Sequence, residues 1–520
     1  MSRSERAGRR GSRRESLRAS RQERHVGSIN PLVNTLPLVE VVNEEGVEKI
    51  HKAAMRLLSD IGFLILDYPS ASEVFRQNGA KVEDNLVKLD EDTLMHFVDM
   101  APKTFTQRAR AAENSVEIGG KNIVFAPVYG PPYVLDHDRG RKQSTLEDMH
   151  NFLKLNHMTP ALQHGGGTVV EPNDVGVNER HLDMIMAHIT CHNKAFMGSV
   201  THADNAADSV AMARILFGQE AIEEQPALLS LVNVSSPLRH DDRMLSVIDV
   251  YAKAKQAMIM APFTVVGAMS PTTLAATLAQ LTAEALISIA YAQMINPGTP
   301  CIMGAFISVV DLRSGAPTFG TGENILLTYA AGQMARRYGL PSRAGGNFTA
   351  SRIPDAQAGY ESAGTIWPTV QAGTNFVLHS AGWLEGGMIS GYEKFILDCE
   401  TLGMMKHYMR GVPTEEEDFA WDAYEEVGPG GHFLGAAHTM RHYETAFYQH
   451  KVFNMDNYEK WEEEGSVDSY KRANGIWKKM LSEYEAPALD EAKKEELEAF
   501  MAHRKEEIRA KKPRTEWQGG

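Results

Sequence analysis

The sequence predicts an α/β protein of the TIM type, a (β/α)8 barrel with an N-terminal α/β cap and a C-terminal helical extension. Two observations predict the barrel. Short apolar runs recur eight times from residue 121, and helical stretches separate them. Strands that are apolar on both faces and alternate with helices are typical of a parallel sheet. A third observation is the absence of a G-x-G-x-x-G or P-loop motif, which disfavours an open dinucleotide-binding sheet.

The repeating units can be placed along the chain. The predicted strands are residues 122–128, 161–170, 195–200, 226–235, 258–266, 300–310, 340–348 and 375–382. The predicted helices are 145–158, 179–190, 205–217, 241–257, 271–295, 321–338, 355–372 and one from near Met388. Eight such units over about 280 residues match a closed barrel.

Local residues support several helix ends. Thr145 with Asp148 resembles a capping box, and Ser270-Pro271 supplies an N-cap with a proline in the first turn. Gly218 and Gly339 fit helix ends that need a positive φ.

Four segments follow from these patterns: an arm (1–28), a cap (29–120), the barrel (121–410) and an extension (411–520). The first 25 residues hold nine Arg against three Glu, which predicts a basic, disordered arm; no apolar stretch follows that would make it an export signal. The cap begins with an amphipathic helix over 44–61, then a short strand and two helices at 70–79 and 90–100. The extension has i,i+4 acid–base pairs, and we expect it to pack on the barrel or on a second subunit of a homo-oligomer.

Composition excludes several classes of function. The net charge is −14 although the first 25 residues carry +6, and so acidic a body is a poor binder of nucleic acid. No apolar run of about 18 residues indicates a membrane span. Cys191, Cys301 and Cys399 are far apart in sequence, which fits a reducing, cytoplasmic compartment.

In such a barrel, reactive groups lie in the loops that follow the strands. Those loops supply aromatic side chains and carboxylates with few cations, a set that suits a quaternary ammonium ion held by cation–π contacts. For any single aromatic residue, packing in the core is the stronger alternative. His188 with His192 is better explained by packing on a helix face than by a metal, and the group His432, His438 and His442 by a Gly-rich contact between domains or subunits, so we predict no metal site.

Longer motifs point to a family. They are IHKAAMRLLSDIGF, APKTF, DLRSGAPTFGTGE (311–323), PDAQAGYES (354–362), NFVLHSAGWLEGG (375–387) and VGPGGHFLGAAHT (427–439). With these motifs the chain resembles the trimethylamine methyltransferase family of corrinoid-dependent methylamine and betaine methyltransferases.

The resemblance implies a barrel that passes a methyl group from an amine to the Co(I) corrinoid of a separate small protein. Founding members carry pyrrolysine near the loop that corresponds to residues 347–357. Only standard residues stand there in this chain, which therefore resembles the non-pyrrolysine branch. A quaternary amine leaves as a neutral tertiary amine and needs no such help. We therefore expect a betaine-type substrate, glycine betaine first, with proline betaine or carnitine behind it.

Ten residues are the predicted site. Asp355, Gln357, His379 and Glu385 form the predicted catalytic set, and the predicted substrate-binding residues are Tyr129, Tyr133, Asn347, Phe348, Glu361 and Trp383. The tyrosines and Phe348 are expected to hold the cation. The carboxylates of Asp355, Glu361 and Glu385 are expected to balance its charge, and His379, Gln357 and Asn347 to bind the substrate carboxylate. Two alternatives stay open: tetrahydrofolate as the direct acceptor, and a non-catalytic barrel that binds a quaternary amine.

Overall fold

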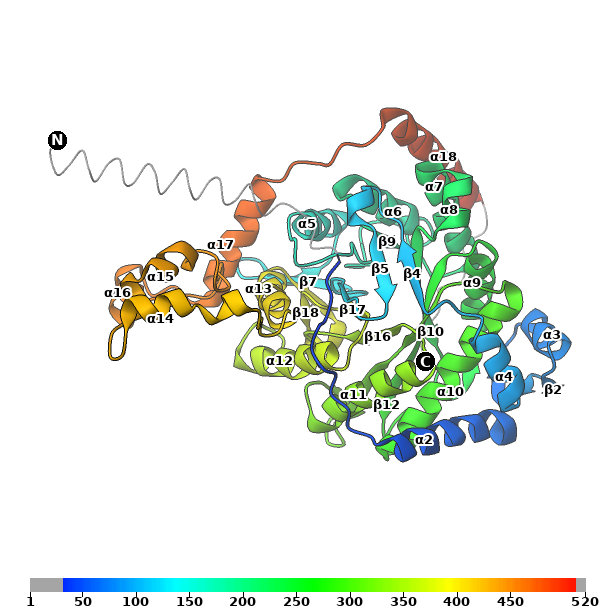
Figure 1. Ribbon diagram of the computed structural model, residues 1–520. Coiled ribbons are helices and arrows are strands. Elements are labelled where there is room, and N and C mark those ends of the chain that lie inside the picture. The colour runs from blue at the N-terminus through cyan, green and yellow to red at the C-terminus, as the bar shows by residue number, and fades with distance from the viewer. Residues whose placement is uncertain (1–30, 511–520) are drawn as a thin grey trace.

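The computed structural model describes residues 31–510, so the predicted arm of residues 1–28 lies outside the described part of the chain. Figure 1 shows helices arranged around a group of central strands. Each strand range predicted from residue 195 onward contains an observed strand. The structure is a mixed α/β fold with a mainly parallel sheet.

Parallel pairing joins the central strands into a continuous series. In spatial order they are β9 (Phe196–Met197), β10 (Leu228–Val234), β12 (Ala257–Val266), β13 (Cys301–Gly304), β16 (Ser342–Gly345), β17 (Phe376–Leu378) and β6 (Val124–Phe125). Residues 163–166 connect the two ends of the series. His164 forms a parallel bridge with Ala195, and its backbone N–H donates to the Phe125 carbonyl at 3.2 Å. We name these eight segments the strand ring; the strand predicted at 161–170 contributes only this bridge.

An apolar cluster fills part of the interior of the strand ring, and a hairpin covers one end of it. Val124, Ile259 and Phe376 belong to one buried cluster with Phe105 and Ile118. The last two come from the antiparallel hairpin β4 (Thr104–Gln107) and β5 (Val116–Gly119). Because Gln107 donates to the carbonyl of Ala227, just before β10, the hairpin lies at the amino ends of the strands. At the carboxyl ends of the strands lie the loops that lead into the helices.

Eight helices correspond to the eight predicted ones. They are α5 (Leu146–His157), α6 (Arg180–Cys191), α7 (Ala203–Phe217), α9 (Asp242–Lys253), α10 (Leu274–Ile295), α11 (Gly322–Arg337), α12 (Ala356–Gln371) and α13 (Tyr392–Tyr408). The capping box of Thr145 and Asp148 is confirmed, as are the positive φ angles of Gly218 and Gly339. The predicted cap at Ser270 is wrong: α10 begins after Thr273, and the Ser270 hydroxyl bonds that of Thr277 at 2.8 Å.

Helix α10 is buried between the strand ring and the N-terminal cap. By length and composition it is apolar enough to cross a membrane, so the expectation that the chain lacks an apolar run of about 18 residues is wrong, but 83% of that apolar window is buried inside the fold. Helices α2 (Glu44–Arg56), α3 (Pro69–Gln77) and α4 (Glu91–Val98) pack against it. Between them lie β1 (Phe63–Ile65), β2 (Lys81–Glu83) and β3 (Leu86–Lys88), and β1 pairs in parallel with β11 (Arg239–His240).

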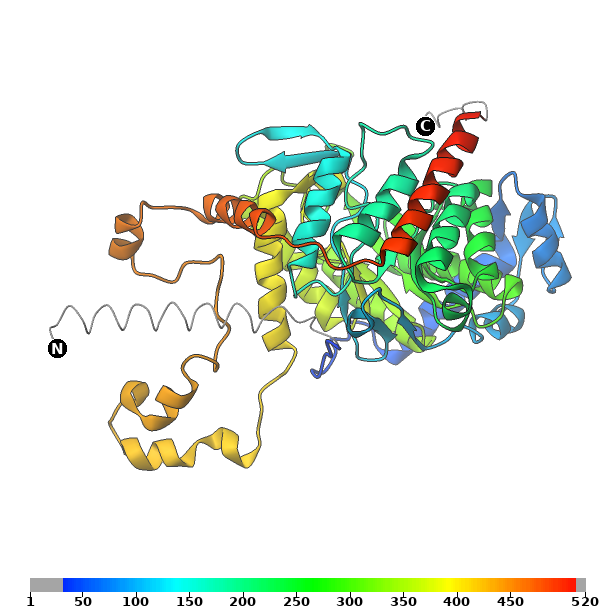
Figure 2. The ribbon, with the colours of Figure 1, turned by 90° about the horizontal axis from the view of Figure 1, so that it is seen from above.

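The C-terminal extension divides into a packed part and a projecting part. Helix α17 (Ser469–Ser482) packs on α13 and α5, and α18 (Glu491–Ala510) packs on α7. Arg504 Nε donates to Asp208 at 2.7 Å and fixes α18 there. Helices α14 (Trp421–Val427), α15 (Ala437–His442) and α16 (Tyr458–Glu463) project from the body, as Figure 2 shows.

Candidate active site

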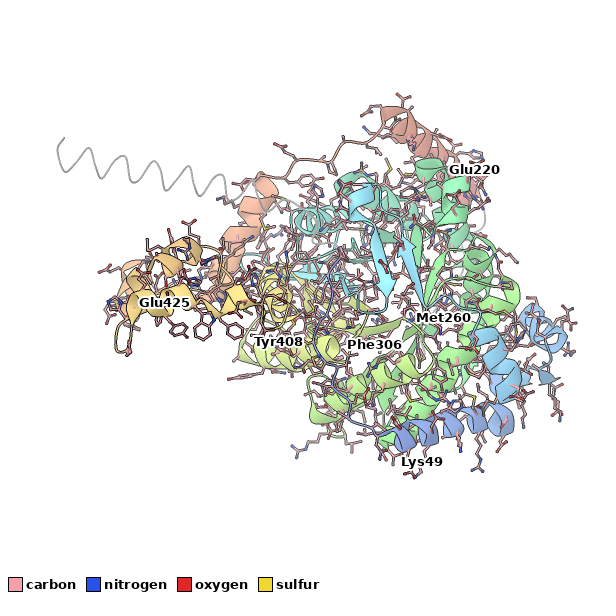
Figure 3. The ribbon with its side chains drawn as sticks, in the orientation of Figure 1. Lys49, Glu220, Met260, Phe306, Tyr408 and Glu425 are labelled. Carbon is pink, nitrogen blue, oxygen red and sulfur yellow. The ribbon has the colours of Figure 1, made fainter. Side chains whose placement is uncertain are left out.

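Five aromatic side chains gather at the carboxyl ends of neighbouring strands of the ring. Phe306 lies on β14 (Phe306–Val310), which continues β13; Phe348 follows β16, and His379 follows β17 directly. Phe319 and Trp383 complete this aromatic cluster, in which ring centroids of contacting pairs are 4.6–6.0 Å apart. Figure 3 labels Phe306 inside the fold, among the strands. Phe306 is half-buried and the other four are buried, so the accessible ring faces lie on the Phe306 side.

The Phe348 loop is fixed by hydrogen bonds that it donates to side chains of α12. The Phe348 N–H donates to Thr365 Oγ1 at 3.0 Å, and the Glu361 carboxylate accepts from the Thr349 hydroxyl at 2.6 Å and the Ala350 N–H at 2.8 Å. Gly345 leaves room for the ring, since a Cβ there would lie 1.8 Å from a Phe348 ring carbon. Glu361 is therefore a positioning residue for Phe348.

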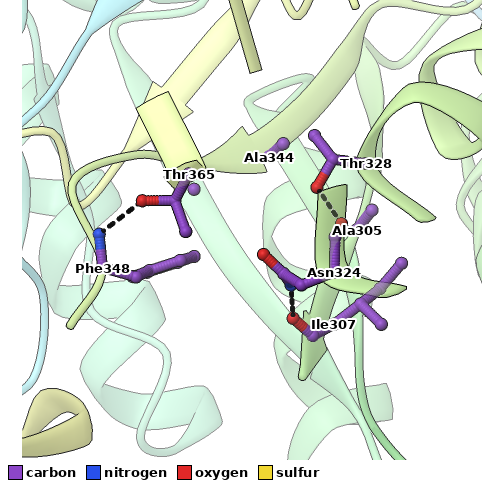
Figure 4. A pocket seen from close by; sticks show the side chains of 8 residues that line it. Ala305, Ile307, Asn324, Thr328, Ala344, Phe348 and Thr365 are labelled. Carbon is purple, nitrogen blue, oxygen red and sulfur yellow. Dashed lines mark hydrogen bonds between the residues drawn. The ribbon is translucent and has the colours of Figure 1, made fainter. Parts of the chain in front are cut away.

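A small cavity lies behind Phe348 (Figure 4). It is lined by Ala305, Ile307, Asn324, Thr328, Ala344, Gly345, Phe348 and Thr365 and measures about 10 Å³. That volume holds one water molecule at most. An organic cation does not fit there and has to approach the aromatic cluster from its open side.

Asn347 and His379 adopt backbone angles that are uncommon for residues other than glycine. Their φ angles are +52° and +63°, and both side chains are buried. The Asn347 amide donates to the Ser380 carbonyl and so connects the two loops. Residues held in the left-handed region cluster at functional sites, where the surrounding contacts maintain the strain.

His379 is neutral in this setting. Its Nδ1 accepts the backbone N–H of Tyr129 at 3.2 Å, which assigns the ring proton to Nε2. Burial, and next the charge of Arg343, hold the pKa of His379 well below its ordinary value. Burial also raises the pKa of the half-buried Tyr129 to about 12, so its hydroxyl keeps its proton.

Four of the ten predicted residues lie elsewhere. The Arg141 guanidinium stands 3.6 Å from the centroid of the Tyr133 ring, and Arg141 Nε donates to Glu385 at 3.2 Å. Tyr133 and Arg141 lie on a small sheet of β18 (Trp383–Leu384), β19 (Ile389–Gly391), β7 (Tyr133–Asp136) and β8 (Gly140–Gln143), and Glu385 follows β18 directly. The Tyr133 ring therefore already has a cation on it.

Asp355 and Gln357 are exposed at the start of α12. Asp355 is the N-cap and accepts from the Ala358 N–H at 3.0 Å and from the Ser351 hydroxyl at 2.9 Å. These hydrogen bonds lower the pKa of Asp355. Gln357 donates to Glu361 at 2.9 Å. Both side chains serve the helix and its loop.

Arg343 is the residue that the sequence reasoning missed. It lies on β16 inside the strand ring, paired in register with Gly304 and Phe376, and is 1% exposed. Its Nη1 donates to the Ala305 carbonyl at 3.1 Å, and its guanidinium carbon is 5.3 Å from the Phe306 centroid. Its Nε and Nη2 have no hydrogen-bond partner. The available signal was a charged residue inside the apolar run 340–348.

His188 and His192, which the sequence analysis considered as metal ligands, are buried and bonded within the fold. His188 Nδ1 and His192 Nε2 are 2.8 Å apart, and His188 Nε2 donates to the Gly167 carbonyl at 2.7 Å. Burial keeps both rings neutral by lowering their pKa values. Among residues 31–510 no group of three or more His, Cys, Asp or Glu side chains has a metal-binding arrangement.

Comparison with known proteins identifies the family. The sequence model of the family "Trimethylamine methyltransferase (MTTB)" matches residues 6–509. The chain belongs to the trimethylamine methyltransferase family. This confirms the family predicted from the motifs, and with it the assignment as a methyltransferase.

The chain is similar to several named members of the trimethylamine methyltransferase family. The glycine betaine methyltransferase of Desulfitobacterium hafniense (strain Y51) is 43% identical, over 91% of this chain and 98% of that protein. The proline betaine:corrinoid methyltransferase of Eubacterium limosum is 29% identical, over 79% and 87%. The trimethylamine methyltransferase MttB of Methanosarcina barkeri (strain Fusaro / DSM 804) is 28% identical, over 76% and 81%. Among solved structures, the Methanosarcina barkeri monomethylamine methyltransferase is 13% identical and has a TM-score of 0.48. The match covers 85% of this chain and 95% of that chain.

Proposed function

We propose that this enzyme transfers a methyl group from a quaternary amine of the betaine type to the corrinoid of a separate protein. The observation that carries the proposal is the aromatic cluster at the carboxyl end of the strand ring, which we interpret as a (β/α)8 barrel. Aromatic faces attract a quaternary ammonium ion by about 0.5–2 kcal/mol. The names of the glycine betaine and proline betaine relatives support the same substrate class.

The proposed methyl transfer needs no general acid or base from the protein. The bond between the methyl carbon and nitrogen breaks, nitrogen keeps the electron pair, and the product leaves as a neutral tertiary amine without a proton. The corrinoid, when its carrier is bound, supplies the electron pair that forms the new bond to carbon. A neutral His379 and an un-ionised Tyr129 are consistent with such a reaction.

The side chains of the site orient the substrate and exclude water. Orientation of this kind supplies about 7–11 kcal/mol in favourable cases. Asn233 on β10 is exposed and Phe263 on β12 is half-buried, although β10 and β12 side chains further down, such as Leu231 and Ile259, are buried in the ring. This open side of the strand ring gives a separate acceptor protein a direct approach to the aromatic cluster.

The test is a methyl-transfer assay with free cob(I)alamin as acceptor, followed by the absorbance of methylcobalamin. The substrates are glycine betaine, proline betaine, carnitine, choline and trimethylamine. We expect transfer from a betaine and none from trimethylamine. Phe348→Ala should lower kcat/KM about tenfold, because it removes one ring of the cation site, with Tyr133→Ala as the matched control. Transfer from trimethylamine alone would overturn the proposal, and so would a repeat of the assay with tetrahydrofolate in which only that acceptor is methylated.

Two further features are part of the proposal. A homo-oligomer is supported by the projecting segment, where Trp421, Tyr424, Leu434 and Phe447 expose more than half of their surface. Sedimentation of the purified chain tests it, and a monomer at micromolar concentration contradicts it. A cytoplasmic location rests on the three separate cysteine thiols.

A further inference from the structure

Arg343 is a buried cation with unused hydrogen-bonding capacity. Two of its three nitrogens, Nε and Nη2, have no hydrogen-bond partner, and the third, Nη1, donates to the backbone carbonyl of Ala305. A guanidinium ion offers five N–H donors in a planar fork that matches a carboxylate. Leaving such donors buried and unpaired is costly, and native structures keep them so only for a reason.

No carboxylate of the described chain neutralises Arg343. Across residues 31–510 none of the ion pairs includes it, and burial is the cause that lowers its pKa, to about 9. The carboxylates next to the aromatic cluster are engaged elsewhere. Glu361 holds the Phe348 loop, and Asp398 accepts from Lys394 and from the Gly382 N–H. A carboxylate that pairs with Arg343 would therefore belong to a bound molecule.

The position of Arg343 identifies the kind of anion. Its guanidinium contacts Phe306, and the Phe306 ring in turn contacts Phe348, at 5.3 Å, and His379, at 5.6 Å. The anion site and the proposed cation site therefore share one side chain. A ligand that fills both must carry a carboxylate a short distance from a quaternary nitrogen, which is the structure of a betaine.

We propose that Arg343 binds the carboxylate of the substrate and makes the enzyme selective for zwitterionic betaines over cations such as choline. The inference rests on the proposed function, since it names the group that selects among quaternary amines. Choline carries the same trimethylammonium group but ends in a hydroxyl, which leaves the charge of Arg343 unpaired. A site whose buried polar groups need a partner rejects an analogue that lacks it far more strongly than an apolar pocket does.

The experiment compares two arginines that both stack on an aromatic ring. Arg343→Met is the test variant, Arg343→Lys keeps the charge without the fork, and Arg141→Met is the matched control on the Tyr133 ring. We expect Arg343→Met to lower kcat/KM for glycine betaine by about 100-fold or more, and Arg343→Lys by about tenfold. Arg141→Met should stay within twofold of the wild type.

Binding gives a readout that is independent of methyl transfer. Isothermal titration should show that Arg343→Met loses affinity for glycine betaine but keeps that for tetramethylammonium, which carries the cation alone. Wild-type transfer from glycine betaine with Arg343→Met within threefold of it overturns the inference and leaves the proposed function standing. No transfer from any quaternary amine overturns the proposed function, and the titration then decides the role of Arg343 alone. If Arg343→Met does not fold, Arg343→Lys decides: kcat/KM for glycine betaine within twofold of the wild type overturns the inference, and about a tenfold loss with unchanged affinity for tetramethylammonium supports it.

Discussion

Among residues 31–510, two buried cations have no carboxylate partner, and they differ in what surrounds them. Lys194, just before β9, donates to three carbonyls, those of Asn156 at 2.6 Å, Thr159 at 3.0 Å and Leu162 at 2.7 Å. These carbonyls lie at and after the end of α5, where a positive charge is favourable. Arg343 donates to one carbonyl, and two of its nitrogens have no hydrogen-bond partner. A buried cation whose donors are all used supports the fold, whereas one with spare donors marks a place for a ligand.

The largest expected effect separates the two residues by stability. Lys194→Met leaves three buried carbonyls without their donor, and each such group costs about 1–3 kcal/mol. We expect the free energy of unfolding to fall by about 3 kcal/mol or more, measured by urea denaturation. Arg343→Met removes an uncompensated buried charge, so its free energy of unfolding should change by less than about 1 kcal/mol or rise.

The reverse result would break the comparison. If Arg343→Met is the more destabilised variant, Arg343 is a structural residue like Lys194, and its unpartnered donors are satisfied by bound water. Leu162→Met is a suitable control for the packing around Lys194, because it changes an apolar side chain of similar volume and leaves the carbonyl in place.

A smaller effect is the dependence of stability on pH. Burial lowers the pKa of Lys194 to about 7, against an ordinary value of 10.5. Between these values the unfolded chain holds a proton that the folded chain has released, so the free energy of unfolding rises with pH. The rise is up to about 1.4 kcal/mol for each pH unit from this group.

The measurement is urea denaturation of the wild type and Lys194→Met at pH 7.5, 8.0 and 8.5. The difference between the two should grow with pH. The difference between the wild type and Arg343→Met should stay flat below pH 8, because the pKa of Arg343 is lowered only to about 9. A flat difference for Lys194 as well would show that its three carbonyls hold the proton in place.

The sequence predicted the helices well and the site only in part, for reasons that these residues illustrate. The sequence placed all eight helices around the strand ring, most of them because they bury one face along their own length and α10 because it is a long apolar run. Phe348, Trp383 and His379 come together because they follow neighbouring strands. Asp355 was a candidate by its position in a motif, but its hydrogen bonds cap α12.

Arg343 escaped prediction for a different physical reason. A single basic residue in an apolar run looks the same in sequence whether its donors are used, as in Lys194, or unused. The difference depends on carbonyls that are 32–38 residues away from Lys194 and on a carboxylate that no described residue brings to Arg343. Only the three-dimensional arrangement shows which donors lack a partner.

The smallest expected effect concerns a third cation, Arg141, whose partner is the predicted catalytic residue Glu385. The pair is partly exposed, with side-chain exposures of 42% and 30%, and such pairs contribute about 0–1 kcal/mol. We expect Glu385→Gln to leave kcat/KM for glycine betaine within twofold of the wild type. The reason is that the Glu385 carboxylate pairs with Arg141, which stacks on Tyr133 and not on a ring of the aromatic cluster. A tenfold loss in the same assay, with Arg141→Met unchanged, would return Glu385 to the catalytic set and show that a carboxylate balances the ammonium charge at the open side of the ring.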